Sequence, residues 1–244
     1  MDISYRGTSF NGWQIQPNGV TVQAEIEKAI STLLKTETAV TGSGRTDTGV
    51  HATQQIAHFD VEKSIDADDI AYKLNSFLSP DISINRIRPV QPEAHARFNA
   101  EQRTYYYKIH QAKDPFAQGL SYMFAPKMNI AQINKACKIL LEWENFECFS
   151  KVQTEVNHFR CNITVAKWYK IGPKNQFVIS ADRFLRGMVR AIVGTLIEVG
   201  LGKITLDEFK EILESQDRKR AGRAVPPEGL YLQEVTYPSD IYLD

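Results

Sequence analysis

The sequence has little cysteine, and its few cysteines are not spaced for cross-linking or metal binding. Among 244 residues, Cys137, Cys148 and Cys161 form no C-x-x-C pair, and their odd number argues against a disulfide framework. The five histidines are scattered, and His51 and His58 are seven residues apart with no H-x-x-x-H pair flanked by glutamate. We therefore predict a reducing, cytoplasmic compartment and neither a structural nor a catalytic metal.

Long hydrophobic runs are also missing from the sequence. No apolar stretch approaches the roughly 20 residues that a membrane-spanning helix needs, and Asp2 and Arg6 interrupt any signal-peptide core. We expect no membrane association. With 43% hydrophobic and 24% charged residues, the composition is that of a globular protein with one large core or two small ones.

Net charge is absent, because 29 basic residues balance 29 acidic ones, and a neutral chain argues weakly against a nucleic-acid partner. The charges are unevenly distributed, however. The stretch 160–190 carries seven basic residues and one acid, Asp182, which gives seven minus one, or plus six. The basic residues are Arg160, Lys167, Lys170, Lys174, Arg183, Arg186 and Arg190. This run predicts a surface that binds a polyanion, the alternative being a solvated face without function.

Apolar residues at helical spacing predict five helices. Thr21 is the expected N-cap of the first, and Thr205 forms a capping box with Glu208 before the last. The first expected helix follows Thr21, and its apolar stripe is Val22, Ile26, Ile30, Leu33 and Leu34. The second begins near Asp66, and its apolar residues are Ile70, Leu74, Phe77 and Leu78. The other three are expected over Ile130 to Leu141, over Met188 to Val199 and after Thr205.

Shorter apolar stretches bounded by turn residues predict strands. The single strands are a short one around Ile3 and Tyr5, then Gln54 to Val61, Ile82 to Ile87, Arg103 to His110 and Leu230 to Val235. A hairpin is expected between Ile163 to Ile171 and Phe177 to Ala181, with Gly172-Pro173-Lys174-Asn175 as its turn. This pattern predicts an α+β fold. We expect two lobes, 1–98 and 99–244, each a mainly antiparallel sheet with helices packed on one side, and an active-site cleft between them with Asp47 at its floor.

The most unusual segment runs from Gly42 to Ala52 and reads GSGRTDTGVHA. Its three glycines allow the backbone to approach a ligand closely. Asp47 stands between two threonines, with Arg45 just before them. These neighbours favour a carboxylate that stays ionised and keeps one orientation, as a nucleophile or a base requires. On composition alone, a tight connecting turn with a capping aspartate is the favoured interpretation, because aspartate and glycine are common in turns.

Two other functional interpretations of this segment are weaker. A phosphate-binding loop would need the spacing G-x-x-x-x-G-K-[ST] or G-x-G-x-x-G, which the segment lacks. An aspartic protease needs two carboxylates that share a proton, and the chain has no second Asp-Thr-Gly to accompany Asp47-Thr48-Gly49. A homodimer could supply the second one, but the polar residues before Asp47 are unlike a buried strand.

The segment G-R-T-D-x-G-V-H-A strongly resembles the signature of the tRNA pseudouridine synthase A family, and the resemblance covers nearly the whole chain. Further matching motifs are Gly12-Trp13-Gln14-x-Gln16, Arg97-Phe98-x-Ala100, Arg103-x-Tyr105-x-Tyr107, Arg183-Phe184-Leu185, Met188-Val189-Arg190-x-Ile192-Val193-Gly194 and Gly229-Leu230-Tyr231-Leu232. One departure is the first strand, which is shorter than such folds usually have. We expect that departure to affect the edge of the sheet.

The resemblance implies an isomerase that converts uridine to pseudouridine at positions 38 to 40 of tRNA, without cofactor, as a homodimer. By resemblance, Asp47 is the catalytic carboxylate, Tyr105 lies against the base, Arg190 pairs with the carboxylate, Leu230 lines the uracil pocket and Arg45 fills the space left by the flipped nucleotide. Without the family, Tyr105 and Leu230 would be interpreted as packing residues and Arg190 as a side chain that reaches solvent. The competing hypothesis is a noncatalytic tRNA-binding or RNA-folding module.

Overall fold

The computed structural model describes residues 1–152 and 156–243, which form two compact units. The first unit is Met1–Arg103 with Tyr231–Asp244, and the second is Thr104–Leu230. The last strand of the chain therefore belongs with the first unit. The α+β class predicted from the sequence is confirmed. The boundary at 98/99 and the cleft between two lobes stay predictions.

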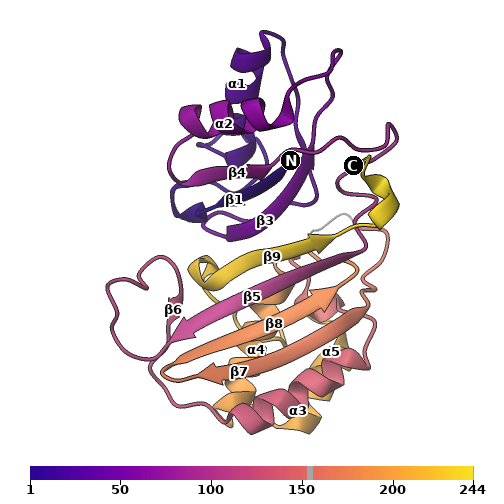
Figure 1. Cartoon of the computed structure of the whole chain (residues 1–244). Coiled ribbons are helices and arrows are strands. Elements are labelled where there is room, and N and C mark those ends of the chain that lie inside the picture. The colour runs from indigo at the N-terminus through magenta and orange to yellow at the C-terminus, as the bar shows by residue number, and fades with distance from the viewer. Residues whose placement is uncertain (153–155, 244) are drawn as a thin grey trace. The chain divides into compact units, whose positions relative to one another are not determined.

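The sheet of the first unit contains the strands β4 (Ile82–Arg86), β1 (Asp2–Tyr5), β3 (His51–His58) and β9 (Leu230–Thr236), in that order (Figure 1). β1 is antiparallel to both of its neighbours, whereas β3 and β9 are parallel. A two-residue strand, β2 (Thr41–Gly42), pairs with the end of β3. The strand pairs are therefore mainly antiparallel, as predicted, and the parallel pair β3–β9 makes the sheet mixed.

The short first strand is an interior strand, so the expectation that it affects the sheet edge was wrong. β1 has only four residues, yet it is hydrogen-bonded to β3 on one side and to β4 on the other. Ile3 and Tyr5 are almost completely buried. Because both edges of β1 are paired, its backbone groups are satisfied despite its length.

Two helices complete the first unit, α1 (Val22–Leu34) and α2 (Ala67–Phe77). The predicted cap Thr21 is present and accepts a hydrogen bond from the backbone of Ala24. Asp66, near which the second helix was expected to begin, accepts two backbone hydrogen bonds at the start of α2. Phe77 was expected in the core but is 60% exposed. The reason is that α2 ends there, and the extended residue Leu78 occupies the buried position instead.

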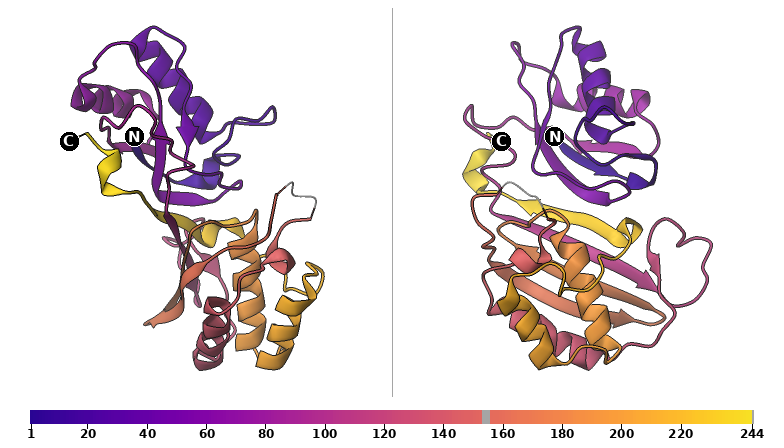
Figure 2. Two further views of the ribbon diagram at one scale, coloured as in Figure 1. Left: turned by 90° about the vertical axis from the view of Figure 1, so that its right-hand side faces the viewer. Right: turned by 180° about the vertical axis from the view of Figure 1, so that it is seen from behind.

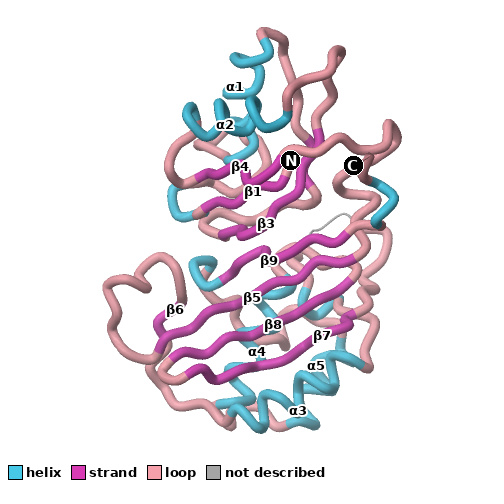
Figure 3. The backbone as a smooth tube through the Cα atoms, viewed as in Figure 1, coloured by secondary structure: helices cyan, strands magenta, loops and turns pink. Residues whose placement is uncertain are grey.

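The sheet of the second unit contains β5 (Gln102–His110), β8 (Lys174–Ala181) and β7 (Ile163–Ile171), in that order. The hairpin turn is shorter than predicted: Ile171 pairs with Lys174, so only Gly172 and Pro173 connect the two strands. A two-residue strand, β6 (Tyr122–Met123), runs parallel to the end of β5 after a long loop (Figure 3).

Three helices cover one face of that sheet, α3 (Ile130–Leu141), α4 (Met188–Gly200) and α5 (Leu206–Ser215) (Figure 2). Trp168, Phe177 and Ile179 are buried in the core of this unit, and the capping box of Thr205 is confirmed. All three cysteines are free and buried, and burial raises the pKa of each thiol to about 12. None of the helices in the described part of the chain is long and apolar enough to cross a membrane.

Candidate active site

The segment that carries Asp47 is an irregular loop of the first unit, between β2 and β3. A buried glutamine holds its first half. Gln55 of β3 accepts a hydrogen bond from the hydroxyl of Ser43 (2.8 Å) and donates one to the carbonyl of Gly44 (2.8 Å). The backbone nitrogen of Ser43 also donates to Ile56 (2.7 Å). The loop therefore begins at a fixed position relative to the sheet.

The residues on both sides of Asp47 are held through backbone and buried hydroxyl groups. The hydroxyls of Thr46 and Tyr5 are hydrogen-bonded at 2.8 Å inside the core, and the nitrogen of Trp13 donates to the carbonyl of Thr46 (3.3 Å). The carbonyl of Asp47 accepts from the nitrogen of Val50 (3.1 Å) and closes a turn. Asp47 itself is only half-buried, so the residue combines a fixed backbone with partial exposure to solvent.

Two glycines allow a neighbouring loop to pack against this backbone. A Cβ atom at Gly12 would lie 2.3 Å from the carbonyl oxygen of Thr46, and the φ angle of Gly12 is +85°. A Cβ atom at Gly7 would lie 2.0 Å from the carbonyl oxygen of Val50. Both distances are far below van der Waals contact, so no other residue fits there without displacing the Asp47 turn.

Arg45 is exposed at the surface of the same loop. Its Nε donates a hydrogen bond to the side-chain oxygen of Gln14 (3.0 Å), which comes from the loop before α1. Gln14 belongs to the motif Gly12-Trp13-Gln14, for which the sequence indicated no role. The contact connects the motif around Gly12 to the motif around Asp47 within one unit.

The other three predicted site residues lie in the second unit. Tyr105 is half-buried in β5, with its ring edge-on to Phe184 at 5.1 Å between centroids and 88° between planes. Arg190 lies in the first turn of α4, where its Nε donates to the carbonyl of Val225 (2.7 Å). Leu230 is 6% exposed at the start of β9.

A single backbone segment links Arg190 to Leu230. The nitrogen of Val225 donates back to the carbonyl of Arg190 (3.1 Å), and the hydroxyl of Tyr107 donates to the carbonyl of Pro226 (2.8 Å). Burial raises the pKa of Tyr107 well above its usual value, so the hydroxyl remains a donor. A Cβ atom at Gly229 would lie 2.5 Å from the ring of Tyr107. The segment before Leu230 is thus fixed in place.

The predicted site residues are therefore divided between the two units. Asp47 and Arg45 belong to the first unit, and Tyr105, Arg190 and Leu230 belong to the second. Arg45 contacts Gln14 of the first unit, and Tyr105 and Arg190 contact Phe184 and Val225 of the second. The predicted pairing of Arg190 with Asp47 stays a prediction.

Two lysines of the long basic run do not share a face of the sheet. Lys167 pairs with Val178 across the hairpin, and Lys170 pairs with Asn175. Because successive side chains of a strand point to opposite sides, these two lysines lie on opposite faces of β7. The sequence interpretation of 160–190 as a single polyanion-binding surface was therefore wrong for these two residues.

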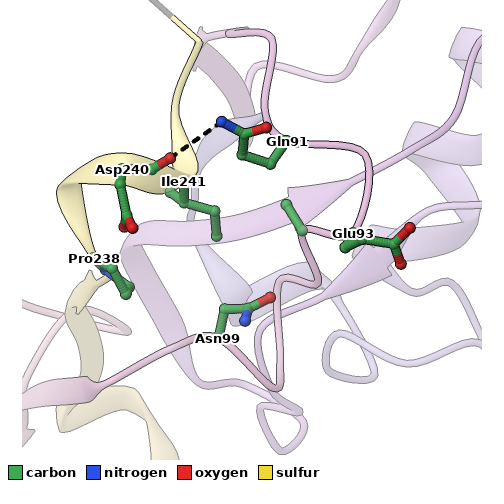
Figure 4. Close-up of a pocket in the computed structure, with 7 residues that line it drawn as sticks. Gln91, Glu93, Asn99, Pro238, Asp240 and Ile241 are labelled. Atoms are coloured by element: carbon green, nitrogen blue, oxygen red, sulfur yellow. Dashed lines mark hydrogen bonds between the residues drawn. The ribbon is translucent and has the colours of Figure 1, made fainter.

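A pocket in the first unit contains none of the predicted site residues (Figure 4). Its volume is about 290 Å³, and its lining includes Glu93, Asn99 and Asp240. Two carboxylates in a small polar pocket are unfavourable for a phosphate or a phosphodiester chain. Within residues 1–152 and 156–243, no group of three or more His, Cys, Asp or Glu side chains is placed to hold a metal ion.

Comparison with known proteins identifies relatives over the whole chain. A family model described as tRNA pseudouridine synthase matches residues 3–99 and 136–238. The tRNA pseudouridine synthase A of Parabacteroides distasonis is 48% identical over 241 residues, which is 98% of this chain and 96% of that protein. The proteins of the same name from Bacteroides thetaiotaomicron (47%, covering 98% and 90%) and Bacillus subtilis (41%, covering 96% and 97%) are similar throughout.

The likeness to solved structures is much weaker. A chain from the crystal structure of a Cbf5-Nop10-Gar1 complex is similar to 81% of this chain and 54% of its own length, with 10% identity and a TM-score of 0.32. Structural similarity at that level is too low to support a conclusion about function.

Proposed function

This chain belongs to the tRNA pseudouridine synthase family, and on that premise we propose that it isomerises uridine to pseudouridine at positions 38 to 40 in the anticodon stem-loop of tRNA. The observation that supports this proposal most directly is the conformation of the loop around Asp47. Its backbone is fixed by Gln55, Thr46 and Val50 while Asp47 stays accessible, as a carboxylate that must meet a large substrate requires.

In the proposed reaction, Asp47 enables cleavage of the bond between N1 of uracil and C1' of the ribose. The detached base rotates and rejoins C1' through C5, the hydrogen of C5 leaves as a proton, and N1 takes up a proton from solvent. Substrate and product therefore contain the same atoms, and the proposed reaction consumes neither a reductant nor an energy source.

The remaining site residues are proposed to act on the base and on the carboxylate. Arg190 would hold Asp47 ionised through a charge-assisted hydrogen bond, and Tyr105 and Leu230 would contact the uracil. Arg45 would occupy the space left by the target nucleotide, because a uridine in a stem must leave the stack to react. Unstacking costs a few kcal/mol, which phosphate contacts elsewhere on the protein would offset.

The competing function is a noncatalytic tRNA-binding or RNA-folding module. Such a module has no use for a partly exposed carboxylate on a fixed backbone, so the geometry of Asp47 favours the enzyme. Three buried thiols without a disulfide support the proposed cytoplasmic location.

Replacing Tyr105 by phenylalanine is expected to preserve tRNA binding and impair catalysis. The edge-on contact of the ring with Phe184 remains, and only the hydroxyl is lost. If that hydroxyl serves the proton transfer at C5, single-turnover pseudouridine formation falls about 100-fold or more, while the Kd for tRNA changes less than about threefold. Tyr106→Phe is the matched control, because the neighbouring side chain points to the other face of β5. Equal rates in the two variants would exclude this role.

We also propose a homodimer, formed through the sheet face of the second unit that the helices leave uncovered. Val165, Lys167, Tyr169 and Ile171 alternate along β7 on that face, and the three apolar residues are 39%, 40% and 58% exposed. The ammonium of Lys167 lies 5.1 Å from the centre of the Tyr169 ring. Such a mainly apolar row on an edge strand favours contact with a second copy over contact with water.

Light scattering at micromolar concentration is expected to give twice the mass of one chain. Tyr169→Glu is expected to give the mass of one chain, because it replaces an apolar ring of the proposed interface with a carboxylate. Lys170→Glu is the control on the opposite face of the same strand, and it should leave the dimer intact. A wild-type protein that is purely monomeric contradicts the dimer, and a dimer that persists in Tyr169→Glu contradicts this interface.

A further inference from the structure

Phe98 is 75% exposed on a turn of the first unit, and the turn is not a loose loop. His95 accepts hydrogen bonds at Nδ1 from the backbone nitrogens of Arg97 (3.1 Å) and Phe98 (3.3 Å). The side-chain oxygen of Asn99 accepts from the nitrogen of His95 (2.6 Å). The phenylalanine is therefore presented to solvent by a backbone that is already ordered.

Two further side chains hold Ala96 at the centre of this turn. Its nitrogen donates to Nδ1 of His58 (3.1 Å), and its carbonyl accepts from the hydroxyl of Tyr237 (2.5 Å). Burial, reinforced by the neighbouring His95, lowers the pKa of His58, which keeps its ring neutral and able to accept. Burial raises the pKa of Tyr237, so its hydroxyl stays protonated and able to donate.

Aromatic and cationic groups flank the exposed ring. The ring of His95 lies 4.3 Å from that of Phe98 between centroids, tilted by 32°. The guanidinium of Arg97 lies 5.6 Å from the centre of the Phe98 ring. Proteins bind unpaired nucleotides with this combination, because a base stacks on the aromatic ring while a cation attracts the phosphate.

Arg103 connects this turn to the segment that carries Asp47. Its Nη2 donates to the carbonyls of Arg97 (2.9 Å) and Ser43 (3.0 Å), and its Nη1 donates to the carbonyl of Ala100 (3.2 Å). A single guanidinium thus ties the backbone beside Phe98 to the backbone four residues before Asp47. All of these groups lie in the first unit, so the connection does not depend on the second.

We propose that Phe98 and Arg97 form a second RNA-contact site, in which the ring of Phe98 stacks on an unpaired base of the substrate and Arg97 contacts an adjacent phosphate. Arg103 is a positioning residue that fixes the distance between this contact and Asp47. The RNA is held over the exposed ring and not in the neighbouring pocket, where Glu93 and Asp240 repel phosphate. The inference rests on the proposed function for the identity of the RNA.

The test compares phenylalanine variants on unmodified tRNA, with both Kd and steady-state kinetics as readouts. Phe98→Ala is expected to weaken binding and raise KM by about tenfold, with kcat nearly unchanged, because one stacking contact is lost. Phe98→Trp is expected to restore both values, since tryptophan also stacks. Phe116→Ala is the control, because Phe116 is a 91% exposed phenylalanine of the second unit.

Arg97→Gln supplies an independent readout. The slope of log affinity against log salt is expected to decrease by roughly one, which corresponds to one lost phosphate contact. The melting temperature of each variant should equal that of the wild type, because the altered side chains are exposed.

Wild-type binding and KM in Phe98→Ala would overturn the proposal, as would failure of Phe98→Trp to restore them or an equal loss in Phe116→Ala. An unchanged salt slope in Arg97→Gln would exclude the phosphate contact. If the wild type bound tRNA but formed no pseudouridine, the proposed function would fail, while the binding measurements would still decide the contact at Phe98.

Discussion

Asp47→Asn is expected to abolish turnover while leaving the affinity for tRNA within about an order of magnitude. The substitution removes the negative charge at nearly constant size. The turn at Asp47 is closed by its backbone carbonyl, which asparagine retains, and Thr46 beside it is anchored to Tyr5. Pseudouridine formation in a single turnover, measured together with Kd, separates the loss of chemistry from the loss of binding.

Asp68→Asn is a suitable control for this experiment. Asp68 is an exposed residue in the first turn of α2, and its substitution also removes one negative charge from the same unit. It should leave turnover and affinity unchanged. Turnover retained in Asp47→Asn would remove Asp47 from its proposed role, whereas a matching loss in Asp68→Asn would show that the effect is not local.

Gly12→Ala is expected to lower both the stability and the activity of the protein. The new methyl group would lie 2.3 Å from the carbonyl oxygen of Thr46, and a φ angle of +85° is strained for alanine. We expect a loss of about 2 to 4 kcal/mol in the free energy of unfolding and at least a tenfold loss of kcat, because relief of the clash displaces the Asp47 turn.

Gly44→Ala is the matched control within the Asp47 segment. A Cβ atom at Gly44 has no neighbour within 4 Å, so the added methyl group is expected to cost little stability. Denaturant unfolding and single-turnover rates, measured for both variants, test the comparison. Equal stability and activity in the two variants would contradict the packing argument for the loop at Gly12.

The helices could be predicted because their signals are local. Thr21, Asp66 and Thr205 each cap a helix through bonds to residues two or three positions later, so a short window of sequence contains the whole interaction. Strand boundaries were less accurate. β3 begins at His51, three residues before the predicted start.

His51 shows why that boundary was not visible in the sequence. Its Nδ1 accepts a hydrogen bond from the backbone nitrogen of Gly7 (3.0 Å), and its ring stacks on Tyr231 at 4.6 Å between centroids. These partners lie 44 and 180 residues away in the chain, so no local pattern indicates that a histidine belongs to the core. The parallel pairing of β3 with β9 depends on the same long-range contacts.

The site shows the same division between local and distant signals. The Asp47 motif is contiguous, so the sequence indicated its position and the family resemblance its chemistry. The side chains that hold this loop by hydrogen bonds could not be predicted from the sequence. Gln55, Gln14 and Arg103 reach the loop from separate segments of the chain. The opposite orientations of Lys167 and Lys170 were missed because a count of charges ignores the alternation of side chains along a strand.

Release of tritium from C5 of uridine tests the central claim most directly. When the new bond forms at C5, the hydrogen originally there must leave, so unmodified tRNA labelled at C5 is expected to release tritium to water. Release should proceed without added metal, nucleotide or reductant, continue in the presence of a chelator, and be absent in Asp47→Ala. If folded wild-type protein binds this tRNA and releases no tritium, the assignment as a uridine isomerase is contradicted.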